Sequence, residues 1–85
     1  MEAPFIFKTL EMAAALSGKQ SLTELYDKVA ESFREHPLFG LDYFTIVNES
    51  NMSPVAQWDK TIKMRACIAA TLGKIRLIDN MAIIL

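Results

Sequence analysis

Hydrophobic residues in the first part of the chain recur with the period of an α-helix. Pro4 stands at the start of this segment, where its fixed φ and missing N–H cost a helix little. Gly18 stands at its end, since glycine readily takes the left-handed conformation that terminates helices. The residues of one broad apolar stripe are Phe5, Ile6, Leu10, Met12, Ala13 and Leu16. The pattern predicts an amphipathic helix between Pro4 and Gly18.

A second amphipathic helix is predicted after Gly18, and its start is well marked. Ser21 and Glu24 form the S-x-x-E pattern of a capping box, which satisfies two backbone N–H groups at a helix N-terminus. Pro37 ends the segment. The apolar face consists of Leu22, Leu25, Tyr26, Val29, Ala30 and Phe33. The opposite face consists of Glu24, Asp27, Lys28, Glu31, Arg34 and Glu35.

After Gly40 the pattern changes to that of β-strands. Residues 41–47 are short and rich in aromatic and β-branched types, which favours a strand, with Phe44 and Ile46 on the side that faces the helices. Residues 48–54 are dense in turn formers and are predicted to be a loop. Residues 62–72 alternate between two sets of side chains, as a strand does, although their Met, Ala and Leu content leaves a helix open as the alternative.

A two-residue hairpin turn is predicted at Gly73 and Lys74. Glycine at the first central position suits a type II′ turn. The resulting register pairs Leu72 with Ile75, Ala70 with Leu77, Ile68 with Asp79, Thr71 with Arg76, Ala69 with Ile78, and Cys67 with Asn80. The core side is then Met64, Ile68, Leu72, Ile75 and Leu77, and the mixed side carries Arg65, Thr71, Arg76 and Asn80. The predicted fold is α+β: two helices packed on one face of a three-stranded antiparallel sheet, in the order ααβββ.

The composition is that of a small globular domain. The chain has 85 residues, of which 52% are hydrophobic and 22% charged, and a domain of this size buries roughly 60–65% of its unfolded surface. Its 9 basic and 10 acidic residues give a net charge of −1. This balance argues against nucleic acid as a partner, because binding phosphates requires a surplus of Lys and Arg on one face. We expect a single domain over residues 1–85.

Sequence features also favour a cytoplasmic location. No run approaches the ~20 apolar residues that span a bilayer, so no membrane partner is expected. Glu2, Lys8 and Glu11 interrupt the N-terminal apolar stretch, unlike a secretory signal. Cys67 is the single cysteine, which excludes an internal disulfide and fits a reducing compartment.

Candidate chemical groups are few and isolated. His36 is the only histidine, and no second histidine or further cysteine completes a zinc site with it; we interpret it as a surface cation near the negative end of the second helix. Cys67 lies in an apolar strand context, which indicates a buried, unreactive thiol rather than a nucleophile. Trp58 either anchors the loop before the second strand or marks an interface.

Motifs for nucleotide chemistry are not supported either. The carboxylates Glu24, Asp27, Glu31 and Glu35 belong to a solvated helix face, which argues against an acid/base pair. The three glycines are isolated from one another and form no phosphate loop. The triplet Lys63–Arg65 loosely resembles the Lys-Met-Ser loops of nucleotide-binding enzymes, but it lacks the serine and lies in a predicted strand. We therefore predict no catalytic, cofactor-binding or metal-binding residue in this chain.

The last strands nevertheless carry a distinctive sequence. The segments LDYFTIVNESNMSPV, RACIAATL and GKIRLIDN closely resemble the C-terminal domain of the pantothenate synthetases (pantoate–β-alanine ligases). That family typically ends in Gly-x-x-Arg-Leu-Ile-Asp-Asn, matched here by Gly73, Arg76, Leu77, Ile78, Asp79 and Asn80. Its preceding strand and loop are matched by Asp42, Tyr43, Ile46, Pro54 and Val55. The resemblance covers essentially the whole chain.

The resemblance implies a role within a larger enzyme. Family members join pantoate to β-alanine with ATP and magnesium, through a pantoyl adenylate, and release AMP and diphosphate. A larger N-terminal nucleotide-binding domain, absent here, carries the catalytic motifs, and the parent enzyme is expected to be a homodimer. The small domain hinges over the active site as a lid, so this chain alone is expected to be inactive. The alternative is a freestanding interaction module that holds a protein partner through its uncovered sheet face or Trp58.

Overall fold

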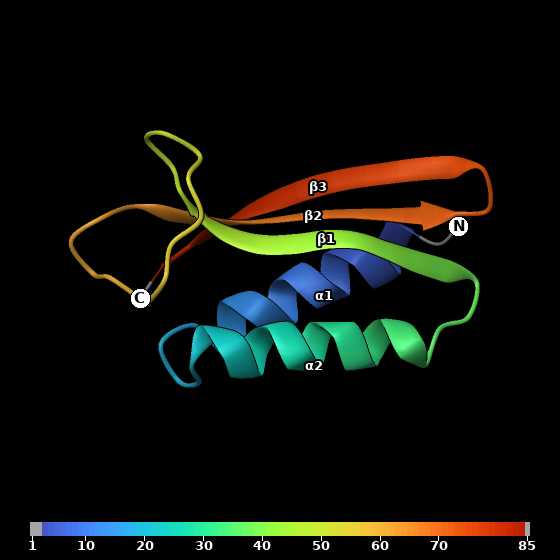
Figure 1. Cartoon of the computed structure of the whole chain (residues 1–85), viewed down its shortest axis with the longest axis horizontal. Coiled ribbons are helices and arrows are strands. Elements are labelled where there is room, and N and C mark those ends of the chain that lie inside the picture. The colour runs from blue at the N-terminus through green and yellow to red at the C-terminus, as the bar shows by residue number, and fades with distance from the viewer. Residues whose placement is uncertain (1–2, 85) are drawn as a thin grey trace.

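Two helices lie side by side under a three-stranded antiparallel sheet (Figure 1). The computed structural model describes residues 3–84. The elements, in chain order, are α1 (Ala3–Ala15), α2 (Leu22–Arg34), β1 (Phe39–Asn48), β2 (Met64–Leu72) and β3 (Ile75–Ile83). The strands are arranged in the order β1-β2-β3. The predicted α+β fold, with the element order ααβββ, is confirmed.

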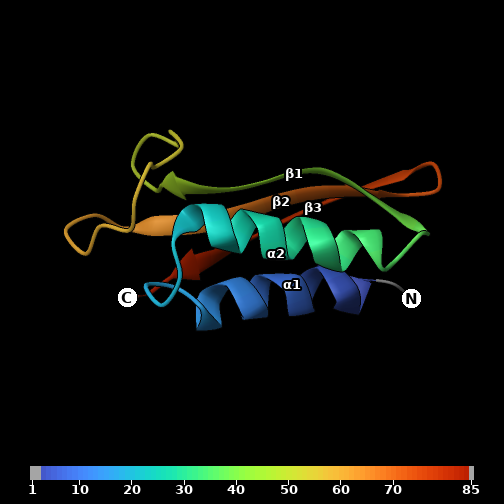
Figure 2. The same cartoon turned by 60° about the horizontal axis from the view of Figure 1, so that its bottom comes forward.

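Both helices cover the same face of the sheet, as the turned view in Figure 2 shows. Neither described helix is both long enough and apolar enough to cross a membrane. The buried core between the helices and the sheet comprises Ile6, Leu10, Ala13, Leu22, Leu25, Val29, Phe33, Phe39, Ile46, Met64, Ala66, Ile68, Ala70 and Ile83. Burying each large aliphatic side chain contributes about 1.5–3 kcal/mol, so the contact between helices and sheet is the main source of stability.

The predicted helix ends are present in the structure. The Glu24 N–H donates to Ser21 Oγ at 3.1 Å, and the Ser21 N–H donates to Glu24 Oε1 at 3.1 Å, which is the complete capping box. Gly18 has a φ of 75°, the left-handed conformation expected where the chain leaves α1. These local signals set the two helix boundaries that face each other across the α1–α2 turn.

The hairpin register is confirmed at each predicted pair, from Leu72 opposite Ile75 to Cys67 opposite Asn80. Residues 64–72 form a strand, so the helical alternative for this segment is wrong. Gly73 has a φ of 62°, and among the described residues other than glycine only Met52 has a positive φ. This combination of a positive φ at Gly73 and a negative one at Lys74 agrees with the type II′ turn.

One expected core residue is exposed. Ile75 lies on the predicted side of the sheet but is 60% exposed, because the hairpin turn extends past the end of the helices (Figure 1). Leu72 and Leu77, next to it on the same side, are half-buried. The register determines which way a side chain points, whereas the length of the helices determines whether it is covered.

The first strand is longer than the sequence predicted and contains an irregularity. It runs from Phe39 to Asn48 rather than over 41–47, and its register with β2 shifts between Leu41 and Tyr43. The extra residue at this bulge is Asp42. A β-bulge inserts one residue into a strand and bends it locally, so the side chains before and after Asp42 keep the alternation that the core requires.

The sheet face opposite the helices is covered by no described helix or strand. We call it the open face. It carries Tyr43, Thr45, Val47, Arg65, Cys67, Ala69, Thr71, Arg76, Ile78, Asn80 and Ala82. At its centre Tyr43, Ala69 and Ile78 form one cross-strand row.

Candidate functional site

The single histidine lies at the surface, as predicted. His36 is exposed two residues beyond the end of α2. Its ring stacks on Phe5, with centroids 4.0 Å apart and an interplanar angle of 29°. Its backbone N–H donates to the Phe33 carbonyl at 3.1 Å. These contacts give His36 a packing role across the ends of the two helices.

Cys67 is buried in β2, on the open face, as the sequence indicated. Burial raises the pKa of the Cys67 thiol, and the nearby Arg65 guanidinium opposes this shift only in part. A raised pKa leaves little thiolate at neutral pH, and the thiolate is the nucleophilic form. The side chain therefore acts as a small apolar residue of the sheet.

The remaining sequence candidates do not converge. Of the acidic residues on α2 and its C-cap, Glu24 is bound in the capping box, and Asp27, Glu31 and Glu35 are exposed. Within residues 3–84 no group of three or more His, Cys, Asp or Glu side chains is placed to hold a metal ion. In the triplet Lys63–Arg65 the central methionine is 1% exposed and belongs to the core. Because β2 begins at this methionine, the triplet leads into a strand and is not a phosphate loop.

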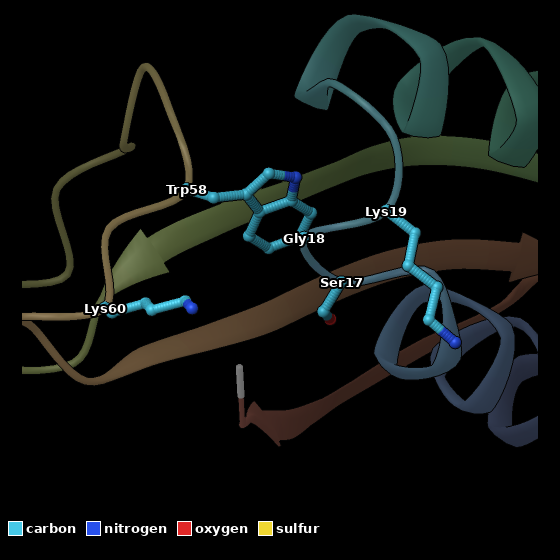
Figure 3. Close-up of a pocket in the computed structure, with 5 residues that line it drawn as sticks. All are labelled: Ser17, Gly18, Lys19, Trp58 and Lys60. Atoms are coloured by element: carbon cyan, nitrogen blue, oxygen red, sulfur yellow. The ribbon is translucent and has the colours of Figure 1, made fainter.

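Trp58 anchors the long loop between β1 and β2 to the α1–α2 turn. Its indole Nε1 donates to the Gln20 carbonyl at 2.5 Å. The ring also forms one wall of a shallow pocket of about 310 Å³, whose other lining residues are Ser17, Gly18, Lys19 and Lys60 (Figure 3). The anchoring role proposed for Trp58 is therefore confirmed.

The chemistry available around this pocket is limited to binding. In Figure 3 the Lys60 side chain points toward Ser17, whereas Lys19 extends away from the indole. The Ser17 hydroxyl donates to the Ala13 carbonyl at 3.0 Å, so its proton is held by the backbone of α1. Next to Lys60, the Asp59 carboxylate accepts hydrogen bonds from the Thr61 side chain and backbone, which lower the pKa of Asp59. None of the described lining residues is a carboxylate or a histidine, and no hydrogen bond joins Lys60 to Ser17.

The structure also reveals polar pairs on the open face that the sequence analysis did not predict. Arg76 Nη2 lies 2.6 Å from Asp42 Oδ2, and Arg76 Nε donates to the same oxygen at 3.1 Å. This ion pair joins β3 to β1 across the central strand. Arg65 Nε donates to Asn80 Oδ1 at 2.9 Å, and its Nη1 lies 3.8 Å from Glu49 Oε1. The ion pair between Arg76 and Asp42 depends on the β-bulge at Asp42, and the local sequence does not indicate that a bulge forms there.

The family model for pantoate–β-alanine ligase matches residues 1–82. The chain belongs to this family. The pantothenate synthetase of Flavobacterium psychrophilum is 34% identical over 82 residues, which are 96% of this chain and 29% of that protein. The pantothenate synthetase of Thermosipho africanus is 37% identical over 84 residues, again covering 96% of this chain and 29% of that protein.

The fold agrees with this membership of the pantoate–β-alanine ligase family. The crystal structure of the pantothenate synthetase from Thermus thermophilus matches with a TM-score of 0.81 and 27% identity, over 99% of this chain and 30% of that chain. The chain therefore spans somewhat less than a third of the relatives that it matches, which is consistent with the predicted resemblance to their C-terminal domain.

Proposed function

We propose that this chain is the small lid domain of an ATP-dependent, AMP-forming ligase that condenses pantoate with β-alanine to pantothenate. In this proposal a pantoyl adenylate forms on a separate nucleotide-binding domain, which binds ATP and magnesium. The lid closes over that intermediate and excludes water, because an acyl adenylate is readily hydrolysed. The parent enzyme is a cytoplasmic homodimer.

The observation that carries the proposal is the family match over residues 1–82 combined with the share of the relatives that it covers. A domain that supplies about 29% of such an enzyme, and whose described histidine, cysteine and carboxylates do not come together in one site, is suited to covering a reaction rather than performing it. The pocket beside Trp58 does not change this conclusion, since its described lining contains no carboxylate or histidine and its one hydroxyl, that of Ser17, donates to the Ala13 carbonyl.

A domain exchange tests the proposal. The part of the Flavobacterium psychrophilum enzyme that this chain matches is replaced by residues 1–85, and pantothenate formation is measured beside two controls: the same enzyme without that part, and this chain alone. We expect the exchanged enzyme to form pantothenate, the truncated enzyme to release AMP with little pantothenate, and this chain alone to do neither. AMP release from this chain with ATP and pantoate would contradict the proposal, as would full activity of the truncated enzyme.

A further inference from the structure

The open face has an apolar centre. In its central row, Ala69 is fully buried although no described element lies above it, because Tyr43 and Ile78 flank it from the two neighbouring strands. Tyr43 and Ile78 themselves are 41% and 61% exposed. Cys67, the neighbouring residue of β2 on the same face, is also buried. A tyrosine and an isoleucine on either side of Ala69 make an exposed apolar patch at the centre of the open face.

This apolar patch is bordered by charged side chains that are already paired within the domain. Arg76 binds Asp42 on one side, and Arg65 binds Asn80 and approaches Glu49 on the other. An apolar centre with a polar rim is the usual anatomy of a protein interface, in which tyrosine and arginine are enriched. Since these rim charges are matched internally, covering this face leaves neither arginine without a partner.

The outward side of α2 has the opposite character. It presents Asp27, Lys28 and Glu31 to solvent, and interface centres are depleted in such residues. The open face is therefore the better candidate for contact with another part of the protein.

The size of the open face favours an occupant within the same polypeptide. Three strands spaced about 4.8 Å apart, each of about nine residues rising about 3.3 Å per residue, make a face of roughly 400 Å². Two such surfaces in contact bury roughly 800 Å², which lies within the range of about 600–1,500 Å² for domains of one chain. It falls short of the ~1,600 Å² of a standard interface between separate proteins. A covalently joined domain is held at high local concentration, so a smaller interface suffices.

We infer that the open face is the surface through which this domain docks onto the nucleotide-binding part of the ligase, with the row Tyr43–Ala69–Ile78 at the centre of the contact. This inference rests on the proposed function. The occupant is the portion of the relatives, about 70% of their length, that this chain does not match.

Two isoleucines on β3 provide a matched test. Ile75 and Ile78 are 60% and 61% exposed, and they point to opposite faces of the sheet. Each is replaced by cysteine in a Cys67→Ala background, and alkylation by iodoacetamide is followed by peptide mass spectrometry. The rates are compared between this chain alone and the exchanged enzyme described above, with ATP, magnesium and pantoate present.

We expect alkylation of Ile78→Cys to be at least tenfold slower in the exchanged enzyme than in this chain alone, and that of Ile75→Cys to change less than twofold. An unchanged Ile78→Cys rate in an exchanged enzyme that forms pantothenate would overturn the docking surface and leave the proposed function standing. If the exchanged enzyme forms no pantothenate and the alkylation rate of Ile78→Cys is also unchanged, both the proposed function and the docking surface are refuted. Protection of Ile78→Cys that grows with the concentration of this chain alone would show that a second copy occupies the face, and would also overturn the inference.

Discussion

The outer edge of β1 depends on one tyrosine hydroxyl, and replacing it tests how the helices are held to the sheet. The Ile46 N–H donates to the Tyr26 hydroxyl at 3.1 Å, and the Ile46 carbonyl accepts from the Val55 N–H at 3.0 Å. Ile46 is fully buried. The Tyr26 ring also meets Phe44 edge-on, with centroids 5.8 Å apart. Tyr26→Phe keeps the ring contact and removes only the hydroxyl.

The expected cost follows from the donor that is left without an acceptor. An unsatisfied buried N–H costs about 1–3 kcal/mol. We expect the lower part of this range, about 1–2 kcal/mol, because Tyr26 is half-buried and water can approach the strand edge. In a domain whose total stability is about 5–15 kcal/mol, such a loss lowers the melting temperature by roughly 4–8 °C per kcal/mol.

Urea denaturation of Tyr26→Phe, followed by circular dichroism, measures this loss. Tyr43→Phe is the matched control, since Tyr43 lies on the same strand as Ile46 but is exposed at the open face, and we expect a change below about 0.5 kcal/mol for it. Equal midpoints for the two variants at an unchanged slope would refute the reasoning, because the hydroxyl would then contribute nothing as an acceptor.

Three further predictions address the capping box, the hairpin and the thiol. Ser21→Ala should lower the free energy of unfolding by about 0.5–2 kcal/mol, and an unchanged denaturation midpoint would show that the helix does not depend on this cap. Leu77→Ala should lower the free energy of unfolding by about 1–3 kcal/mol, which is less than for a fully buried leucine because Leu77 is half-buried. Arg76→Ala should lower it by at most about 1 kcal/mol, since its ion pair is exposed. A larger loss for Arg76→Ala than for Leu77→Ala in thermal melts would indicate a register shifted by one residue. Because burial raises the pKa of Cys67, iodoacetamide at pH 8 should modify the native chain at least tenfold more slowly than the urea-unfolded chain, and equal rates would mean that the thiol is accessible.

The elements that the sequence predicted well are those set by neighbours along the chain. The start of α2 follows from the Ser21–Glu24 pair alone, because both partners lie within one helical turn. The turn at Gly73 fixes the β2–β3 register, since a two-residue loop leaves a single way to pair the flanking strands. Family membership was equally evident from the segment that begins at Gly73, because it is a contiguous pattern.

What only the tertiary structure decided depends on residues far apart in the chain. Ile75 points to the predicted side yet is exposed, because the helices end before they reach it. The Asp42–Arg76 ion pair arises from a bulge in one edge strand and spans the sheet to the other. The anchoring of Trp58 to Gln20 joins segments 38 residues apart. The local sequence pattern determines the face of the sheet to which each side chain points. Whether the helices cover that side chain depends on how far they extend, and the contacts across the sheet depend on where a strand bends. These are properties of the assembled fold, which is why the sequence alone predicted the core and the register but not the border of the open face.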